Sequence, residues 1–132
     1  MTRPFTFTMM EWLEVFCPLS EVVVPELEWL PPEGTGYSLI QLDEPKVEKS
    51  YINGSKQYRI GYDLIAQGNW QVRLTLLDQL SKLSTLIEGM RNKEIGDGIT
   101  IQKVEATTPS LRAQTENGII RYGFSVTIIY KD

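Results

Sequence analysis

The clearest pattern along the chain is an alternation of apolar and polar residues near the C-terminus, where every second residue of 120–130 is apolar. This period of two predicts a half-buried β-strand. A second alternating segment covers residues 58–66 and follows Asn53-Gly54, a dipeptide that tolerates the positive φ angles of a tight turn. We therefore predict a β-hairpin over residues 47–66. Its outgoing strand has few apolar residues, so we expect the hairpin to project beyond the core.

Two other segments have the period of a helix. Apolar side chains recur every three or four residues over 72–90, which predicts a long amphipathic helix with Asn69 as its N-cap. Near the N-terminus, Thr8 and Glu11 have the spacing of a capping box. This spacing predicts a short helix over residues 9–16, which ends before the next proline.

Shorter strands complete the predicted fold. Short apolar segments bounded by proline or turn residues predict three of them, at residues 22–24, 37–42 and 111–115. Residues 99–107 form another strand, whose apolar phase shifts between Ile101 and Val104 as a β-bulge requires. We find no internal repeat. The sequence therefore predicts one domain over residues 1–132 with an α+β fold, in which one long and one short helix cover a mixed or antiparallel sheet with a projecting β-hairpin.

Composition and charge exclude several kinds of protein. The 132 residues include 13 Lys and Arg against 17 Asp and Glu, a net charge of -4, whereas proteins that mainly neutralise phosphates carry clustered cations. The chain has no His and one Cys, which removes the usual zinc sites, histidine-based catalysis and an internal disulfide. No apolar run approaches the roughly 18 residues of a membrane span, and Glu11 and Glu14 interrupt any secretory pattern. We expect a cytoplasmic protein with no cofactor and no membrane partner.

Residues that could carry catalysis are few. Three pairs of carboxylates are close in sequence, namely Glu26 with Glu28, Asp43 with Glu44, and Glu94 with Asp97. Each pair borders a proline or glycine turn, where acidic residues usually form solvated turns. The single Cys17 has no histidine to activate it. The sequence therefore predicts that the protein is not an enzyme, and an acid–base enzyme that uses two carboxylates is the weakest of three hypotheses.

Two segments carry residues suited to binding a partner. On the predicted hairpin, Tyr51 and Tyr58 lie among four cations, which are Lys46, Lys49, Lys56 and Arg59. This mixture favours either nucleic-acid contact or a solvated hairpin whose edge lysines discourage aggregation. In a proline-rich loop, Trp29 beside Leu30 is either a subunit contact or a cover for the core. The candidate contact residues are Trp29, Leu30, Lys49, Asn53, Gly54, Lys56 and Arg59.

Three features of the chain together resemble a known family. They are the segment EPKVEKSYINGSKQYRIGYDLIAQGN, the long amphipathic helix that follows it and the terminal strand FSVTIIY. In this order they are similar to the small minor capsid or tail terminator proteins of long-tailed bacteriophages and prophages. The resemblance covers residues 37–132, and the divergent part is 19–36.

The resemblance implies a structural role in which subunits form a ring, commonly a hexamer, that caps the finished tail tube. Its implied partners are further copies of the chain, the tail tube protein and the head–tail connector protein, with DNA only as passing cargo. It implies a location in the tail or neck of the virion, after assembly in the host bacterial cytoplasm, and it carries over no catalytic residues. A head completion or tail completion role stays open. The alternative hypothesis is a small intracellular binding module for a peptide or nucleic acid.

Overall fold

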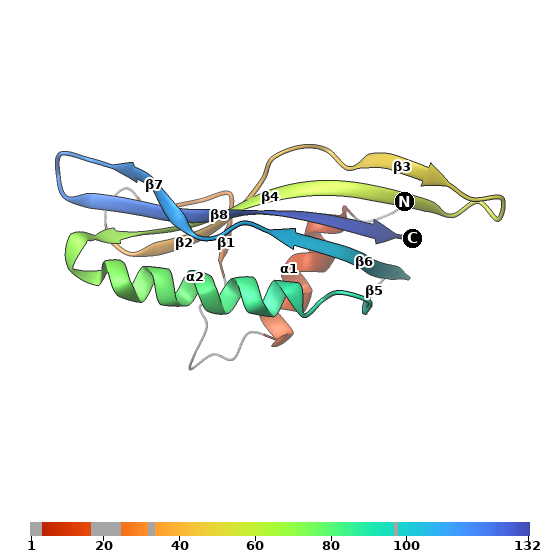
Figure 1. The fold of residues 1–132 in the computed structure, drawn as a ribbon, viewed down its shortest axis with the longest axis horizontal. Coiled ribbons are helices and arrows are strands. Elements are labelled where there is room, and N and C mark those ends of the chain that lie inside the picture. The colour runs from red at the N-terminus through yellow and green to blue at the C-terminus, as the bar shows by residue number, and fades with distance from the viewer. Residues whose placement is uncertain (1–3, 17–24, 32–33, 97) are drawn as a thin grey trace.

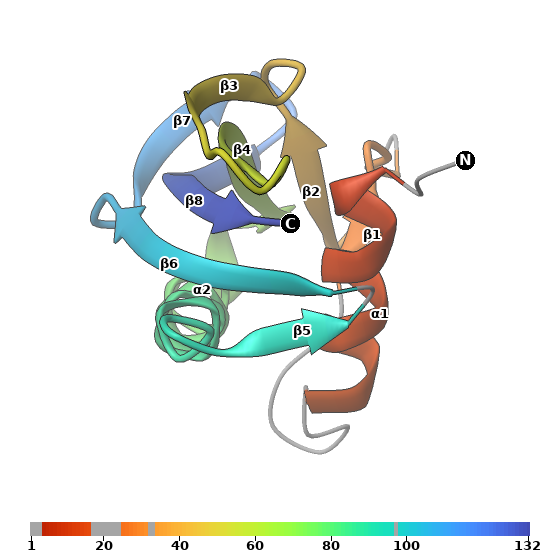
Figure 2. The same cartoon turned by 90° about the vertical axis from the view of Figure 1, so that its right-hand side faces the viewer.

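A curled, eight-stranded sheet forms the body of the protein, and both helices lie on one side of it (Figures 1 and 2). The computed structural model describes residues 4–16, 25–31, 34–96 and 98–132. The elements are α1 (Phe5–Phe16), β1 (Glu26–Leu27), β2 (Gly36–Gln41), β3 (Lys46–Ser50), β4 (Lys56–Asn69), a 3-10 turn (Trp70–Val72), α2 (Arg73–Glu88), β5 (Glu94–Gly96), β6 (Ile99–Ala106), β7 (Ser110–Gln114) and β8 (Ile119–Lys131). β1 is parallel to β2, and the other described pairings are antiparallel. The predicted α+β fold, with a mixed sheet, one long helix and one short helix, is confirmed.

The core lies between the helices and the two longest strands. β4 and β8 pair along their whole length, from Gln57 opposite Lys131 to Asn69 opposite Ile119. Their alternating apolar residues are buried in the same cluster as the helix side chains, as the period of two predicts. The buried side chains of α2 are Leu76, Leu80, Leu83 and Ile87. The predicted apolar stripe of the long helix is therefore confirmed.

Each of these two central strands is bordered by one interrupted strand. β2 and β3 lie end to end along the outer edge of β4, and β6 and β7 do the same along the outer edge of β8. Pro45 stands in the first interruption and Pro109 in the second. Proline has no backbone N–H for a sheet ladder, which explains why both edges break there. As a result, the sheet ends in two hairpins that point in opposite directions (Figure 1).

The two hairpins are built alike. In the first, the pairs 46↔59, 47↔58, 49↔57 and 50↔56 surround one bulge. In the second, each of these pairs recurs 64 positions later, from 110↔123 to 114↔120, with the bulge in the same place. The element order also repeats, because a helix and a short strand precede each set of three strands. The two halves differ in that β1 is parallel to its neighbour and β5 is antiparallel.

An approximate twofold axis relates these halves. It passes between Tyr62 and Val126, which lie opposite each other in the β4–β8 ladder and are themselves 64 positions apart. The structure therefore contains a repeated arrangement, although we find no internal repeat in the sequence. Over residues 45–59, the residues identical to their counterparts are Pro45, Asn53, Gly54 and Tyr58. So few identities leave no repeat that the sequence alone would reveal.

Both hairpin turns use a glycine in the left-handed region of φ. Gly54 has φ +90° and Gly118 has φ +77°. The Gly54 N–H donates to the Tyr51 carbonyl at 3.0 Å, and the Tyr51 N–H donates to the Ser55 carbonyl at 2.9 Å. This is a three-residue loop with a left-handed residue at its end. The predicted hairpin is confirmed, but only the glycine of Asn53-Gly54 has a positive φ.

The start of α1 corrects the sequence prediction. The helix begins at Phe5 rather than at Met9. Thr8, predicted as the N-cap, lies inside the helix with a side chain that is only 2% exposed. Phe5 and Met9 are buried together with Trp12, at the spacing of one helix face. Burial of this longer stripe against the sheet adds a turn that the capping-box pattern does not indicate.

The remaining predictions divide between confirmed and untested. β6 has its register shift between Ile101 and Lys103, which confirms the predicted bulge. Asn69 Oδ1 accepts a hydrogen bond from the Val72 N–H at 3.3 Å, so it caps the 3-10 turn that leads into α2. β1 and β5 have two and three residues, which is too short to show an alternation. The predicted strand at 22–24, as well as Cys17 and Asp97, lies outside the described residues.

Candidate functional site

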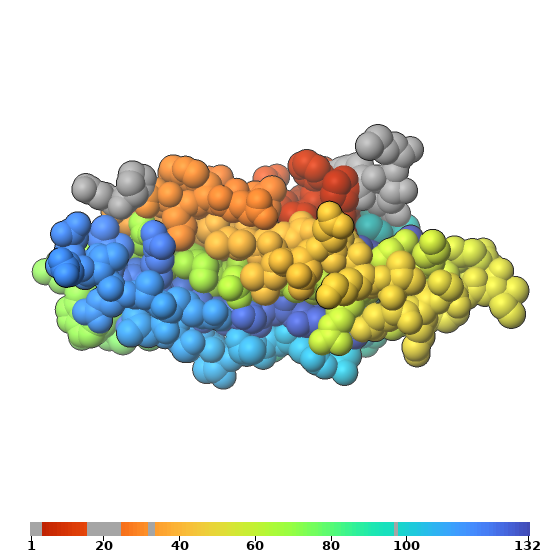
Figure 3. All heavy atoms as spheres, turned by 90° about the horizontal axis from the view of Figure 1, so that it is seen from above, coloured from red at the N-terminus to blue at the C-terminus, as the bar shows by residue number. Residues whose placement is uncertain are grey.

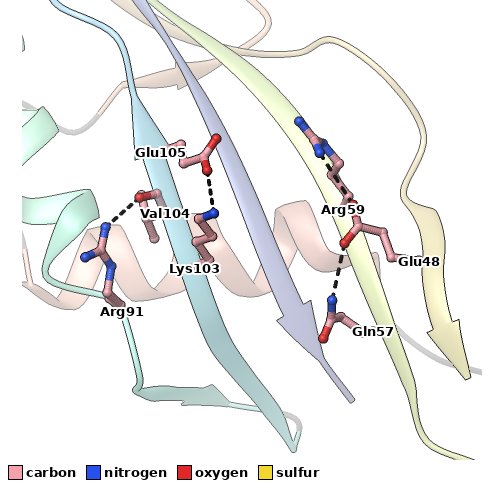
Figure 4. Close-up of polar contacts among 7 residues, drawn as sticks. All are labelled: Glu48, Gln57, Arg59, Arg91, Lys103, Val104 and Glu105. Carbon is pink, nitrogen blue, oxygen red and sulfur yellow. Dashed lines mark hydrogen bonds and ion pairs between the residues drawn. The ribbon is translucent and has the colours of Figure 1, made fainter. Parts of the chain in front are cut away.

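The acidic side chains of the described residues are scattered over the surface rather than gathered in one place. No group of three metal-ligating side chains comes together in residues 4–16, 25–31, 34–96 and 98–132. Of the predicted carboxylate pairs, the members within these ranges are exposed and lie in turns or at strand ends. Glu105 has a lowered pKa because Lys103 hydrogen-bonds it, with an N···O distance of 2.7 Å (Figure 4). That pair is exposed on the strand surface, so it is an ordinary ion pair.

A projecting hairpin is the first surface that could bind a partner. We call residues 46–59 the arm; they comprise β3, the following turn and the first residues of β4. All residues of β3 are exposed, and Ile52 in the turn is fully exposed, at 109%. The arm extends beyond the rest of the molecule (yellow in Figure 3). The predicted projection of this hairpin is therefore confirmed.

Polar contacts stiffen the arm from within. Glu48 accepts hydrogen bonds from Gln57 at 3.2 Å and from Arg59 at 3.5 Å (Figure 4). The Tyr51 hydroxyl donates to Gln57 Oε1 at 3.3 Å, and Lys131 Nζ lies 4.4 Å from the centre of the Tyr51 ring. Arg59 is thus engaged inside the arm. No described carboxylate lies within ion-pair distance of the ammonium groups of the three arm lysines, so they face solvent.

The base of the arm is anchored by stacked aromatic rings. The rings of Phe5 and Tyr130 are stacked with centres 4.1 Å apart, and Tyr58 stacks on Tyr130 at 5.2 Å. Burial raises the pKa of Tyr130, as expected for a phenol among other rings. One face of Tyr58 is therefore occupied within the protein. This leaves at most one face of Tyr58 for base stacking on the hairpin.

A second surface lies where α1 meets β1. A hollow of about 140 Å³ there is lined by Pro4, Thr6, Phe7, Leu27, Glu28 and Gln41. Phe7 is 53% exposed and Leu27 is 39% exposed. Glu26 and Glu28 are exposed beside them. We call residues 26–29 together with Phe7 the ledge, a surface that is both apolar and acidic.

Trp29 belongs to the ledge, and its side chain is 57% exposed. Its backbone N–H donates to Ser38 Oγ at 3.1 Å, which ties the segment to β2. Leu30 is half-buried, and a Cβ placed on Gly36 would lie 3.6 Å from its Cδ2. The sequence left two alternatives for this pair, a subunit contact or a cover for the core. Leu30 covers the end of β2, whereas Trp29 is exposed to solvent.

The loop that carries Trp29 is held by a residue that the sequence does not single out. Gln67 is fully buried, and its Nε2 donates to the Pro31 carbonyl at 2.6 Å. Its Oε1 accepts from Arg121 Nε at 2.8 Å. Gly36 permits this approach, because a Cβ there would overlap Pro31 Cδ. Gln67 stands on the polar face of the β4 alternation, so no sequence signal predicts its burial.

The predicted contact residues fall into two separate groups. Trp29 and Leu30 lie near Ser38, which is opposite Ile65, whereas Lys49, Asn53, Gly54, Lys56 and Arg59 lie on the arm. Ile65 and Lys56 are nine positions apart on β4, about 30 Å at roughly 3.3 Å per residue. The structure does not bring the two groups together. Each molecule instead presents two unlike surfaces.

Three exposed apolar residues of these surfaces, Ile52, Phe7 and Leu27, were not predicted as contacts. Ile52 could have been found from the sequence, because turn positions usually carry polar residues or glycine. Phe7 and Leu27 could not, since their adjacency depends on how α1 packs beside β1.

Neither described helix is long and apolar enough to cross a membrane. A comparison with protein-family models and with curated protein sequences gave no match.

Proposed function

We propose that this protein is a structural component of a long-tailed bacteriophage or prophage, a tail terminator or related minor capsid protein. In this role its copies form a ring, commonly a hexamer, that caps the tail tube and joins it to the head–tail connector, with DNA passing through. The phage context comes from the resemblance of residues 37–132 to that family. The projecting arm is the observation that supports an assembly function.

The argument from the arm concerns symmetry. A ring requires a heterologous interface, in which one surface of each subunit binds a different surface of the next. The arm and the ledge are two such surfaces, because they differ in charge and shape and the arm turn begins about 20 Å along β4 from the position beside Gln41. A protein that acts by binding through its surface also needs no cleft with converging catalytic groups.

The first test of this proposal is the mass of the purified protein. We expect light scattering over a wide concentration range to give either a closed ring or a monomer that assembles only on tail tubes. Ring contacts can be weak before the tube brings subunits together, because occupancy then depends on concentration. A tight dimer that excludes larger rings would contradict the proposal.

The second test separates assembly from nucleic-acid binding, the alternative function. A variant with Ser at Lys46, Lys49, Lys56 and Arg59 should stay folded, because these side chains are on an exposed hairpin. We expect it to lose ring formation or head–tail joining in vitro. If the arm instead grips DNA, the parent protein should bind DNA at about 50 mM salt and lose affinity steeply as salt rises. Salt-sensitive binding by the parent together with normal joining by the variant would favour the alternative.

A further inference from the structure

We infer that the tip of the arm binds the ledge of a second copy of this chain, with Ile52 inserted into the hollow beside Phe7 and Leu27. This inference rests on the proposed function only in taking the partner to be another copy of the chain. It specifies which two surfaces meet, and which side chain of one enters which hollow of the other.

The first support is that the fold does not require an isoleucine at this position. The turn of the second hairpin repeats the arm 64 positions later, with the same register and the same left-handed glycine. Its residue equivalent to Ile52 is Glu116, which is exposed. Because the same backbone is built with a charged residue there, the fully exposed Ile52 has no structural role in the turn. An apolar side chain at the end of a projecting arm is suited to contact with another molecule.

The second support is the shape and chemistry of the hollow. Its volume of about 140 Å³ is large enough to admit one branched aliphatic side chain. Two of its walls, Phe7 and Leu27, are apolar side chains that remain partly exposed in the isolated chain. Filling the hollow with Ile52 would remove all three from water, which favours association.

The third support is charge complementarity between the two surfaces. The arm carries four cations against one carboxylate, Glu48. Beside the hollow, residues 25–31 carry two exposed carboxylates, Glu26 and Glu28, and no Lys or Arg. Of these, Glu28 lines the hollow itself. Opposite charges on two docking surfaces speed the encounter and set its orientation.

The arm cannot fill the hollow of its own molecule. Gln41 lines the hollow and lies opposite Tyr62 on β4. Lys56, where the arm turn rejoins β4, is six positions further along the same strand, about 20 Å away at roughly 3.3 Å per residue. The strand is held in line there, because Gln57 still pairs with Lys131 of β8. The occupant must therefore be another molecule, and a second copy presents both complementary surfaces.

A cysteine pair tests this contact directly. The full chain with Cys17→Ser, Ile52→Cys and Leu27→Cys is oxidised with diamide and run on a non-reducing gel. We expect a ladder of disulfide-linked dimers, trimers and larger species. The matched control carries Glu116→Cys in place of Ile52→Cys, which puts the thiol at the equivalent position of the other hairpin. It should remain monomeric. No ladder from the test pair, or equal ladders from both, would overturn the inference.

A charge exchange tests the electrostatic part without relying on cysteines. Lys49→Glu with Lys56→Glu on the arm should weaken association measured by light scattering, and so should Glu26→Lys with Glu28→Lys on the ledge. A mixture of the two variants should associate again, since each arm then meets a complementary ledge on the other variant. Failure of the mixture to recover association would count against the contact. If the cysteine pair gives only dimers, the arm–ledge contact is supported and the ring of the proposed function is refuted. If light scattering shows a ring but the cysteine pair gives no ladder, the ring is supported and the arm–ledge contact is refuted.

Discussion

Replacement of Leu80 by alanine tests how α2 packs on the sheet. Leu80 lies in the middle of α2 with no exposed surface. It belongs to the cluster that joins α2 to β4, β6 and β8. Because Leu80 lies within this buried cluster, the neighbouring side chains have little freedom to collapse into the space that Leu80→Ala leaves.

The cost has two parts. Alanine lacks three carbons of leucine, and at about 0.8 kcal/mol per buried carbon group the lost transfer free energy is about 2.4 kcal/mol. A residual cavity of about 50 Å³, at about 24 cal/mol per Å³, adds about 1.2 kcal/mol. We therefore expect Leu80→Ala to lower the free energy of unfolding by about 3.5 kcal/mol. That is a large share of the roughly 5 to 15 kcal/mol that stabilises a typical domain.

Urea unfolding followed by circular dichroism measures this loss. With a denaturant slope of about 2 kcal/mol per molar, the midpoint should fall by nearly 2 M. The control is Lys82→Ala, whose side chain is 43% exposed and pairs with Asp78 at 3.2 Å. An exposed ion pair on a helix contributes about 0.5 kcal/mol or less, so this midpoint should barely move. Equal midpoints for both variants would show that the assigned face of α2 is wrong.

Two further predictions concern a buried tyrosine and the turn of the arm. Burial raises the pKa of Tyr62 above its ordinary value of 10.0. The unfolded chain therefore loses the Tyr62 proton at a lower pH than the folded protein does. The stability that the buried, neutral Tyr62 contributes is complete below pH 10 and is lost as the pH rises above it. Between pH 9 and 11.5, the free energy of unfolding should fall less steeply with pH in Tyr62→Phe than in the parent protein, with a difference in slope of up to about 1.4 kcal/mol per pH unit. Identical slopes would contradict the assignment. Gly54→Ala should lower the free energy of unfolding by about 1 to 2 kcal/mol, because alanine is strained at a φ of +90°. A steric clash adds nothing to this loss, since no atom lies within 4 Å of the added Cβ. Thermal unfolding should give a similar loss for Gly118→Ala, and unequal losses would argue against equivalent turns.

Local patterns in the sequence predict those features that depend on neighbouring residues. The period of two predicts β4 and β8, because alternate side chains of a strand point to opposite faces. The spacing of the leucines predicts which face of α2 is buried. Two Asn-Gly dipeptides place both hairpins, and the phase shift after Ile101 predicts the bulge of β6. In each case the determining residues lie within a few positions of one another.

Other features depend on contacts between residues that are distant in the chain. The first turn of α1 forms because Phe5 stacks on Tyr130, a contact that no local pattern contains. Gln67 is buried because a loop more than thirty positions earlier crosses it. The repeat is visible in the register of the hairpins and in the order of the elements, since the fold fixes the backbone while few side chains are shared.

The same distinction applies to the candidate site. Sequence reasoning identified the arm and Trp29 because a turn dipeptide, a row of cations and a proline-rich loop are local signals. It could not show that the arm and the ledge lie at separate places on one sheet, or that Phe7 and Leu27 enclose a hollow. Those facts follow from the order in which strands pair and helices pack. That order is set by burying one shared core, to which residues from both halves of the chain contribute at once.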